Sequence, residues 1–144
     1  MAYGTPDDVA ALARVHSRDG HWYDDNEDYG IEGTNPTLAT VRSWLDNISA
    51  QMDVALGAQW FAVPLNANAS PIAFRAVSQY VCGLVADLAH LANGIEREVS
   101  PQGKILQDMM KWVQLGADGL LKDGIRQVPT PSIKTQASFR VVGS

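Results

Sequence analysis

Residues 70–94, SPIAFRAVSQYVCGLVADLAHLANG, decide the fold class. Ser70 and Pro71 are typical of a helix N-cap and first turn, and Asn93-Gly94 is typical of a helix end. Apolar side chains cover most of the circumference of the helix between them. The polar interruptions are Arg75, Ser78, Gln79, Asp87 and His90. Because a helix that is apolar on most sides is buried, we expect this helix to lie at the centre of an all-α bundle.

The segment before it predicts a second long helix. It opens at Asn35-Pro36-Thr37 and ends at Gly57. Apolar side chains recur at spacings of three and four, as one buried face of a helix requires. These are Leu38, Val41, Leu45, Ile48, Met52 and Leu56.

Two further helices complete a predicted bundle of about four. The first begins at Thr5-Pro6-Asp7-Asp8, where a threonine cap, a first-turn proline and two acids suit a helix N-terminus. The apolar pattern of this helix ends near His16. The last opens at Ser100-Pro101 and is interrupted from Gly116 onward. Its apolar side is Ile105, Leu106, Met109, Trp112 and Val113.

Composition excludes several classes of protein. The chain has 144 residues, enough for one domain, and its single cysteine, Cys82, allows no internal disulfide and no zinc ribbon. A net charge of −5 argues against a nucleic-acid reader with a basic face. No signal peptide is visible, and the longest apolar run is far short of the ~20 residues that cross a bilayer. We therefore expect a soluble protein made in the cytoplasm, with no membrane partner.

The acidic residues are concentrated near one end of the chain. Residues 1–35 hold eight acidic and two basic residues, whereas no acid follows Gly124. Residues 17–35 have no helical or strand period and are expected to form a long acidic loop. Loops of this length in a compact domain are commonly functional or disordered. The aromatic side chains at 22, 23 and 29 indicate that part of the loop docks on something.

The C-terminal residues predict an extended arm, 125–144, on a helical domain, 1–124. Pro129 and Pro131 favour extended chain, and residues 137–142 are of β type. The apolar connection 60–65 is expected to be buried rather than exposed to solvent. Apolar and aromatic side chains dominate protein interfaces. The candidate interface residues are therefore Trp60, Phe61, Leu65, Phe139, Val141 and Val142.

No motif predicts catalysis or a cofactor. The three histidines lack a nucleophile elbow, and no phosphate-binding glycine motif occurs. The strongest metal candidate is a calcium loop, in which Asp24, Asn26 and Asp28 would be alternating oxygen ligands. Tyr29 stands where its turn glycine should be and Asn35 where its bidentate glutamate should be. A solvated acidic loop explains these residues better, and His90 is expected to be a partnered histidine near the core.

The order of these elements resembles the head–tail connector (adaptor, or head-completion) proteins of tailed bacteriophages. The resemblance covers about residues 3–120. It rests on the Thr5 start, on Leu45-Asp46-x-Ile48 to Asp53 in the second helix, on the Trp60–Leu65 turn, and on the long helix after Ser70-Pro71.

The resemblance implies a non-enzymatic virion protein of the phage neck, without cofactor. Its partners would be its own copies in a ring, usually twelvefold, the portal protein, and the next neck or tail protein. The ring would extend the channel through which double-stranded DNA passes during genome packaging and release. The acidic side chains at 24, 25, 27 and 28 (Asp24, Asp25, Glu27, Asp28) would then rim this channel, or face outward against a basic neighbour.

Two other classes remain open. The first is a helical regulatory domain that binds a ligand or partner, with residues 60–65 as one wall of the site. The second, less favoured, is a calcium-binding acidic-loop protein. The first predicts a stable monomer and the second a melting temperature that falls when calcium is chelated.

Overall fold

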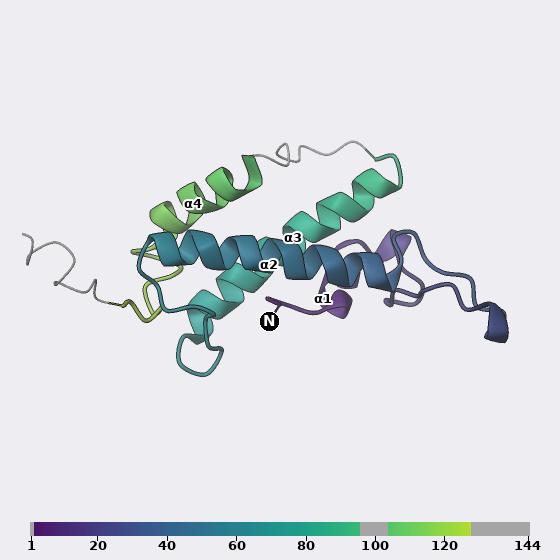
Figure 1. The fold of residues 1–144 in the computed structure, drawn as a ribbon, viewed down its shortest axis with the longest axis horizontal. Helices are drawn as coiled ribbons and strands as arrows, with labels where there is room; N and C mark the ends of the chain where they lie inside the picture. The colour runs from purple at the N-terminus through teal and green to yellow at the C-terminus, as the bar shows by residue number, and fades with distance from the viewer. Residues whose placement is uncertain (1, 96–103, 128–144) are drawn as a thin grey trace, which may run out of the picture.

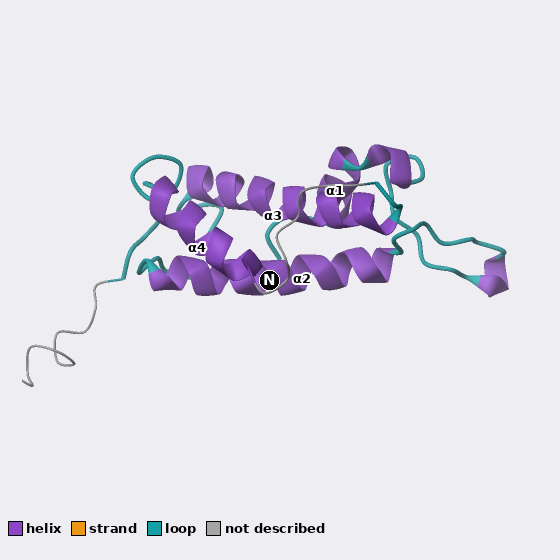
Figure 2. Ribbon diagram, turned by 90° about the horizontal axis from the view of Figure 1, so that it is seen from above, coloured by secondary structure: helices purple, strands orange, loops and turns teal. Residues whose placement is uncertain are grey.

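The computed structural model describes residues 2–95 and 104–127, and within them the fold is all-α. Two long helices, α2 (Leu38–Ala58) and α3 (Pro71–Ala92), run side by side in opposite directions (Figures 1 and 2). The short helix α1 (Pro6–Leu12) packs mainly on α3, and α4 (Ile105–Gly116) packs on α2. No strand occurs in these ranges, only isolated β-bridges. The prediction of an all-α bundle is confirmed.

Local sequence signals place the starts of α1 and α2 correctly. Thr5 Oγ1 accepts the Asp8 N–H at 3.2 Å, and Asp8 Oδ2 accepts the Thr5 N–H at 2.9 Å, which is a reciprocal capping box. Thr37 Oγ1 accepts the Thr40 N–H at 3.3 Å at the start of α2. The predicted apolar face of α2 is the buried one.

The helix α3 ends where the sequence predicts, but its start is capped differently. Ser70 makes no side-chain cap. The carboxylate of Asp123 caps α3 instead, accepting the N–H groups of Ile72 at 2.9 Å and Ala73 at 2.8 Å. A residue about fifty positions away thus neutralises the positive end of this helix, and the expectation of a Ser70 cap is wrong.

Both long helices contribute to the centre of the core. Helix α2 contacts α1, α3 and α4. Helix α3 contacts α1 and α2, and its Tyr80 ring lies 4.5 Å from that of Trp112 on α4. By length and hydropathy α3 could cross a membrane. Its buried side chains belong to the single core cluster, so packing between helices accounts for its apolar character.

The N-terminal segment passes between α2 and α3, where Tyr3 is almost fully buried. The Tyr3 hydroxyl donates to the Asp53 carboxylate on α2 and accepts the Leu65 N–H at 2.9 Å. Burial, reinforced by the bond to Asp53, raises the pKa of Tyr3 above its usual value. Gly4 has φ +93°, and a Cβ there would collide with Cys82 Sγ. This segment therefore joins the two long helices.

Helix α4 and the turns after it close the far end of the bundle. Met109 and Val113 are fully buried, as predicted, and so is Leu121 in the turns that follow Gly116. The predicted opening of this helix at Ser100-Pro101 lies outside the described residues. Asp123 lies in these turns, so its bonds to α3 tie the end of the α4 region to the start of α3.

Candidate functional site

Residues 17–35 contain a projecting hairpin, residues 23–34, and we call the whole segment the acidic hairpin. It extends from the end of the bundle where α2 begins, and its tip is the short turn of 3₁₀ helix Glu27–Tyr29 (Figure 1). Asn26 and Ile31 exchange two backbone hydrogen bonds of 2.8 Å each. Nearer the bundle, the Thr34 N–H donates to the Tyr23 carbonyl at 2.9 Å.

Three side chains hold the acidic hairpin to the bundle and to itself. Trp22 is 3% exposed, and its Nε1–H donates to the Pro6 carbonyl at 2.9 Å. Asp24 Oδ1 accepts the Ala39 N–H at 2.9 Å in the first turn of α2. Asp25 Oδ1 accepts the Gly33 N–H at 2.6 Å. Of the three aromatic residues in this segment, Trp22 is the one that docks on this chain's own core.

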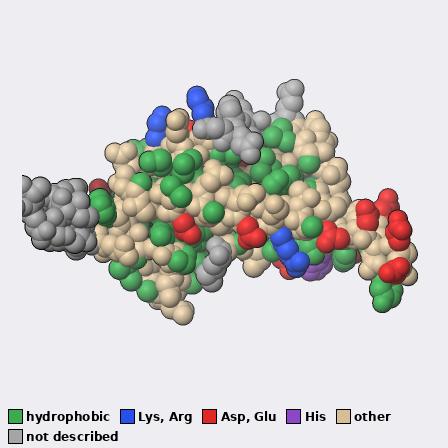
Figure 3. Space-filling view, in the orientation of Figure 1, with side chains coloured by type: hydrophobic (Ala, Val, Ile, Leu, Met, Phe, Trp, Pro, Cys, Tyr) green, Lys and Arg blue, Asp and Glu red, His purple; other side chains and the backbone are tan. Residues whose placement is uncertain are grey.

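The tip of the acidic hairpin presents an aromatic side chain among acids. Tyr29 is 80% exposed and Ile31 is 40% exposed. Glu27, Asp28 and Glu32 are exposed around them. Figure 3 shows the red acidic side chains gathered on this projection. An exposed aromatic side chain with charged neighbours, on a hairpin that its own hydrogen bonds hold, is suited to recognition of another macromolecule.

The calcium candidates do not form a ligand shell here. One oxygen of Asp24 accepts the Ala39 N–H, and Asn26 is paired through its backbone with Ile31. Asp28 lies in the tip turn. In the part of the chain that the structure describes, no group of three or more His, Cys, Asp or Glu side chains is placed to hold a metal ion.

The opposite end of the bundle carries the candidate interface residues of the 60–65 turn. Phe61 and Leu65 are 2% and 3% exposed and belong to this chain's own core, so they are not available as surface anchors. Trp60 is 48% exposed, with φ +67°. Of the three predicted residues in this turn, Trp60 alone lies at the surface. Phe139, Val141 and Val142 lie outside the described residues.

The first residues of the predicted arm pair with this turn. The Ala62 N–H donates to the Ile125 carbonyl, and the Gln127 N–H donates to the Trp60 carbonyl, each at 2.6 Å. The Arg126 guanidinium lies 4.6 Å from the centre of the Phe61 ring. A Cβ on Gly124 would stand 2.7 Å from that ring, so glycine permits the close approach. The chain therefore leaves the bundle beside Trp60.

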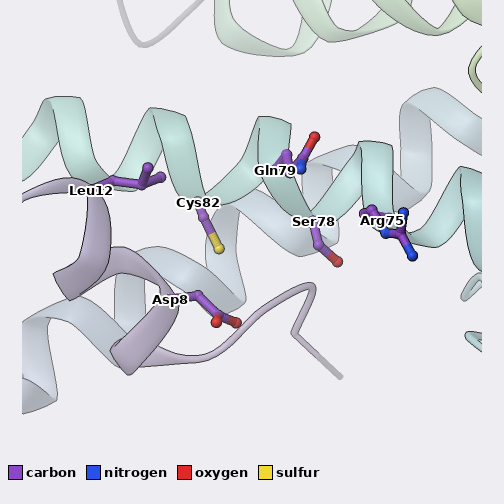
Figure 4. A pocket seen from close by; sticks show the side chains of 6 residues that line it. All are labelled: Asp8, Leu12, Arg75, Ser78, Gln79 and Cys82. Atoms are coloured by element: carbon purple, nitrogen blue, oxygen red, sulfur yellow. The ribbon is translucent and has the colours of Figure 1, made fainter.

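A groove of about 470 Å³ lies between α1 and α3 (Figure 4). Its lining residues are Asp8, Leu12, Arg75, Ser78, Gln79 and Cys82. Ser78 Oγ is buried without a hydrogen-bond partner. Burial, with a smaller effect of Asp8, raises the pKa of the Cys82 thiol to about 11. The thiol is therefore protonated at neutral pH and is a poor nucleophile. Pro64 and Leu65 of the 60–65 turn help to line a smaller hollow of about 280 Å³.

Two histidines from distant parts of the chain form a pair. His16 Nε2 lies 2.9 Å from His90 Nδ1, with the rings edge to face. His90 is 8% exposed. The prediction of a partnered histidine near the core is confirmed, and the partner is His16. Burial, followed by the charge of His90, lowers the pKa of His16 below 6.5.

This pair predicts a loss of stability in mild acid. Because the folded-state pKa of His16 lies below its unfolded value, the unfolded chain binds more protons between the two values. The contribution to stability is complete above pH 6.5 and falls as the pH drops below it. We expect the melting temperature to fall more between pH 7.5 and pH 5 for the wild type than for His16→Gln. Equal falls, measured by circular dichroism, would contradict this.

Two of these groups carry no signal in the local sequence. Asp123 and Arg126 act on segments from which they are distant in the chain, and their roles depend on the tertiary fold. Comparison of this chain with protein-family models, with curated protein sequences and with solved structures gives no match.

Proposed function

We propose that this chain is a structural protein of the tailed-phage neck, in which copies form a ring between the portal and the next neck or tail protein. The ring would continue the DNA channel. The proposal is supported by the resemblance in the order of sequence elements and by the surface of the bundle. It assigns the protein to the virion and gives it no catalytic role.

The observation that carries the proposal is exposed apolar surface at both ends of an elongated bundle. Val15 and Tyr29, at the end with the acidic hairpin, are 78% and 80% exposed. Leu115, at the end of α4, is 86% exposed, and Trp60 and Ile125 are about half exposed. Trp60 and Ile125 lie on two segments that pair through their backbones. Exposed apolar side chains that lie together, unlike single ones, favour a protein that makes contacts with others. A ring subunit needs such contacts on two different sides.

Electron microscopy of the protein mixed with the portal of the same phage tests this proposal. We expect added density in a ring on one side of the portal. The full-length chain should be used, since the arm is part of the proposal. Portal rings that show no added density at any protein concentration would contradict it.

The arm gives a more specific prediction. Deleting residues 128–144 keeps the backbone pairing of Gln127 with Trp60, so the melting temperature should stay close to that of the full-length chain. Binding to portal should weaken by about tenfold or more, because several apolar anchors are removed together. Co-sedimentation with portal rings measures this. Unchanged binding by the shortened chain would show that the arm has no part in assembly.

A further inference from the structure

We propose that the tip of the acidic hairpin docks on the opposite end of a second copy of this chain, around Trp60 and Arg126. This inference rests on the proposed function, since it assigns the contact between neighbouring subunits. The docking residues would be Tyr29, Ile31 and the acids beside them on one copy. On the other copy they would be Trp60, Ile125 and Arg126.

The shape of the molecule excludes this contact within one copy. The acidic hairpin joins the first turn of α2, and Trp60 follows the last turn. At 1.5 Å per residue, the 21 residues of α2 separate the two surfaces by about 31 Å. Figure 1 shows the hairpin pointing away from the other end of α2. A Trp60 surface that binds the tip must therefore belong to another molecule.

The charges of the two surfaces are complementary. Residues 19–35 hold six acidic residues and no basic one. At the other end, Lys122 and Arg126 are exposed basic side chains, with Asp118 as an exposed acid in the same turns. Asp123 lies beside this surface, but both of its carboxylate oxygens accept N–H groups of α3. Complementary charge increases the rate of encounter and fixes the register of two surfaces.

Both surfaces also offer the side chains that dominate binding energy. Tyrosine, tryptophan and arginine are the residues most enriched at interface hot spots. Tyr29 is 80% exposed, and Trp60 is 48% exposed. The backbone of each region is held in place, by the Asn26–Ile31 pair in the hairpin and by the bridge between Phe61 and Arg126 at the other end. Ordered surfaces lose less entropy on binding.

A contact between two unlike surfaces repeats from copy to copy. Such a heterologous contact produces a closed ring if the rotation closes and a filament if it does not. The same contact could also be made twice in a two-fold dimer. The mass of the assembly, measured by analytical ultracentrifugation, distinguishes these forms.

Charge reversal tests the inference on the full-length chain. We expect the wild type to self-associate as its concentration rises, and more strongly at low salt. Tyr29→Ala should raise the dissociation constant about thirtyfold, as for a hot-spot residue. Asp28→Lys and Arg126→Glu should each weaken association. Asp46→Lys, the same charge change on the exposed face of α2, should leave association unchanged.

Mixing the two charge-reversed variants gives the decisive result. The Asp28→Lys hairpin should bind the Arg126→Glu end, and the unchanged surfaces should bind each other, so the mixture should recover association. Asp28→Lys alone and Arg126→Glu alone, each at the total concentration of the mixture, should not. Arg126 also covers the Phe61 ring. Lys122, an exposed basic side chain in the turns just before Arg126, therefore gives a second variant of this end, since Lys122→Glu leaves that contact intact and should also weaken association.

Three results would overturn the inference. They are a monomeric wild type at every concentration, unchanged association of Tyr29→Ala and Asp28→Lys, and a mixture of the charge-reversed variants that recovers nothing. The proposed function is judged separately, by binding to portal. Rings on portal that form equally well with Asp28→Lys would reject the docking of the hairpin and leave the neck assignment standing.

Discussion

Replacing Tyr3 by alanine is expected to lower the free energy of unfolding by about 4 kcal/mol, as for other fully buried aromatic side chains. The ring is 1% exposed and packs on Phe74, with centroids 5.7 Å apart. Its hydroxyl joins Asp53 of α2 to the Leu65 N–H, and its backbone N–H donates to Ser49 Oγ at 2.8 Å. Folded domains are stable by only about 5–15 kcal/mol, so this loss is severe.

Tyr3→Phe distinguishes the contribution of the hydroxyl to stability from that of the ring. It keeps the packing and leaves the buried Leu65 N–H without its acceptor, so we expect a loss of about 2 kcal/mol. Tyr29→Phe is the matched control, because the Tyr29 side chain is 80% exposed at the hairpin tip. Urea denaturation followed by circular dichroism measures all three variants. Equal stability of Tyr3→Phe and Tyr29→Phe would show that the Tyr3 hydroxyl contributes nothing.

The helices could be predicted from the sequence because their signals are local. The cap at Thr5 interacts with Asp8, three residues away, and the cap at Thr37 interacts with Thr40. The apolar face of α2 follows from the 3.6-residue period alone. Signals of this kind act within one or two turns, so the chain carries them whatever the tertiary fold.

The contacts that join the helices could not be predicted in the same way. Ser70 has the residue type of a cap, but the carboxylate of Asp123 takes that position, and nothing near Asp123 in the sequence indicates α3. Tyr3 carries no pattern because it belongs to no helix. The fold alone brings these residues to their partners.

The candidate site could be predicted only in part, because the sequence does not show which side chains face inward and which outward. The sequence indicates an acidic segment with aromatic residues, but composition does not distinguish Trp22, which is buried, from Tyr29, which is exposed. Likewise the apolar turn 60–65 gives no sign that Phe61 and Leu65 face inward and Trp60 outward. The direction in which a side chain points depends on backbone geometry, which here includes the positive φ of Trp60.

Asp123→Ala is expected to lower the free energy of unfolding by about 2 kcal/mol, at the upper end of the range for a helix cap. The carboxylate accepts two N–H groups at the first turn of α3, where its negative charge also interacts favourably with the positive end of the helix dipole. Because Asp123 lies in the turns after α4, the loss should loosen the end of the bundle as well. Hydrogen exchange should rise first at the N–H groups of Ile72 and Ala73.

Two control variants distinguish this cap from a general effect of charge. Asp118→Ala removes the same charge from an exposed position in the same turns and should leave stability within about 0.5 kcal/mol of the wild type. Ser70→Ala removes the side chain that the sequence favours as the cap, and should cost less than Asp123→Ala because Ser70 makes no cap. A larger loss for Ser70→Ala than for Asp123→Ala would mean that α3 is capped locally, and that the link between its start and the turns after α4 does not stabilise the fold.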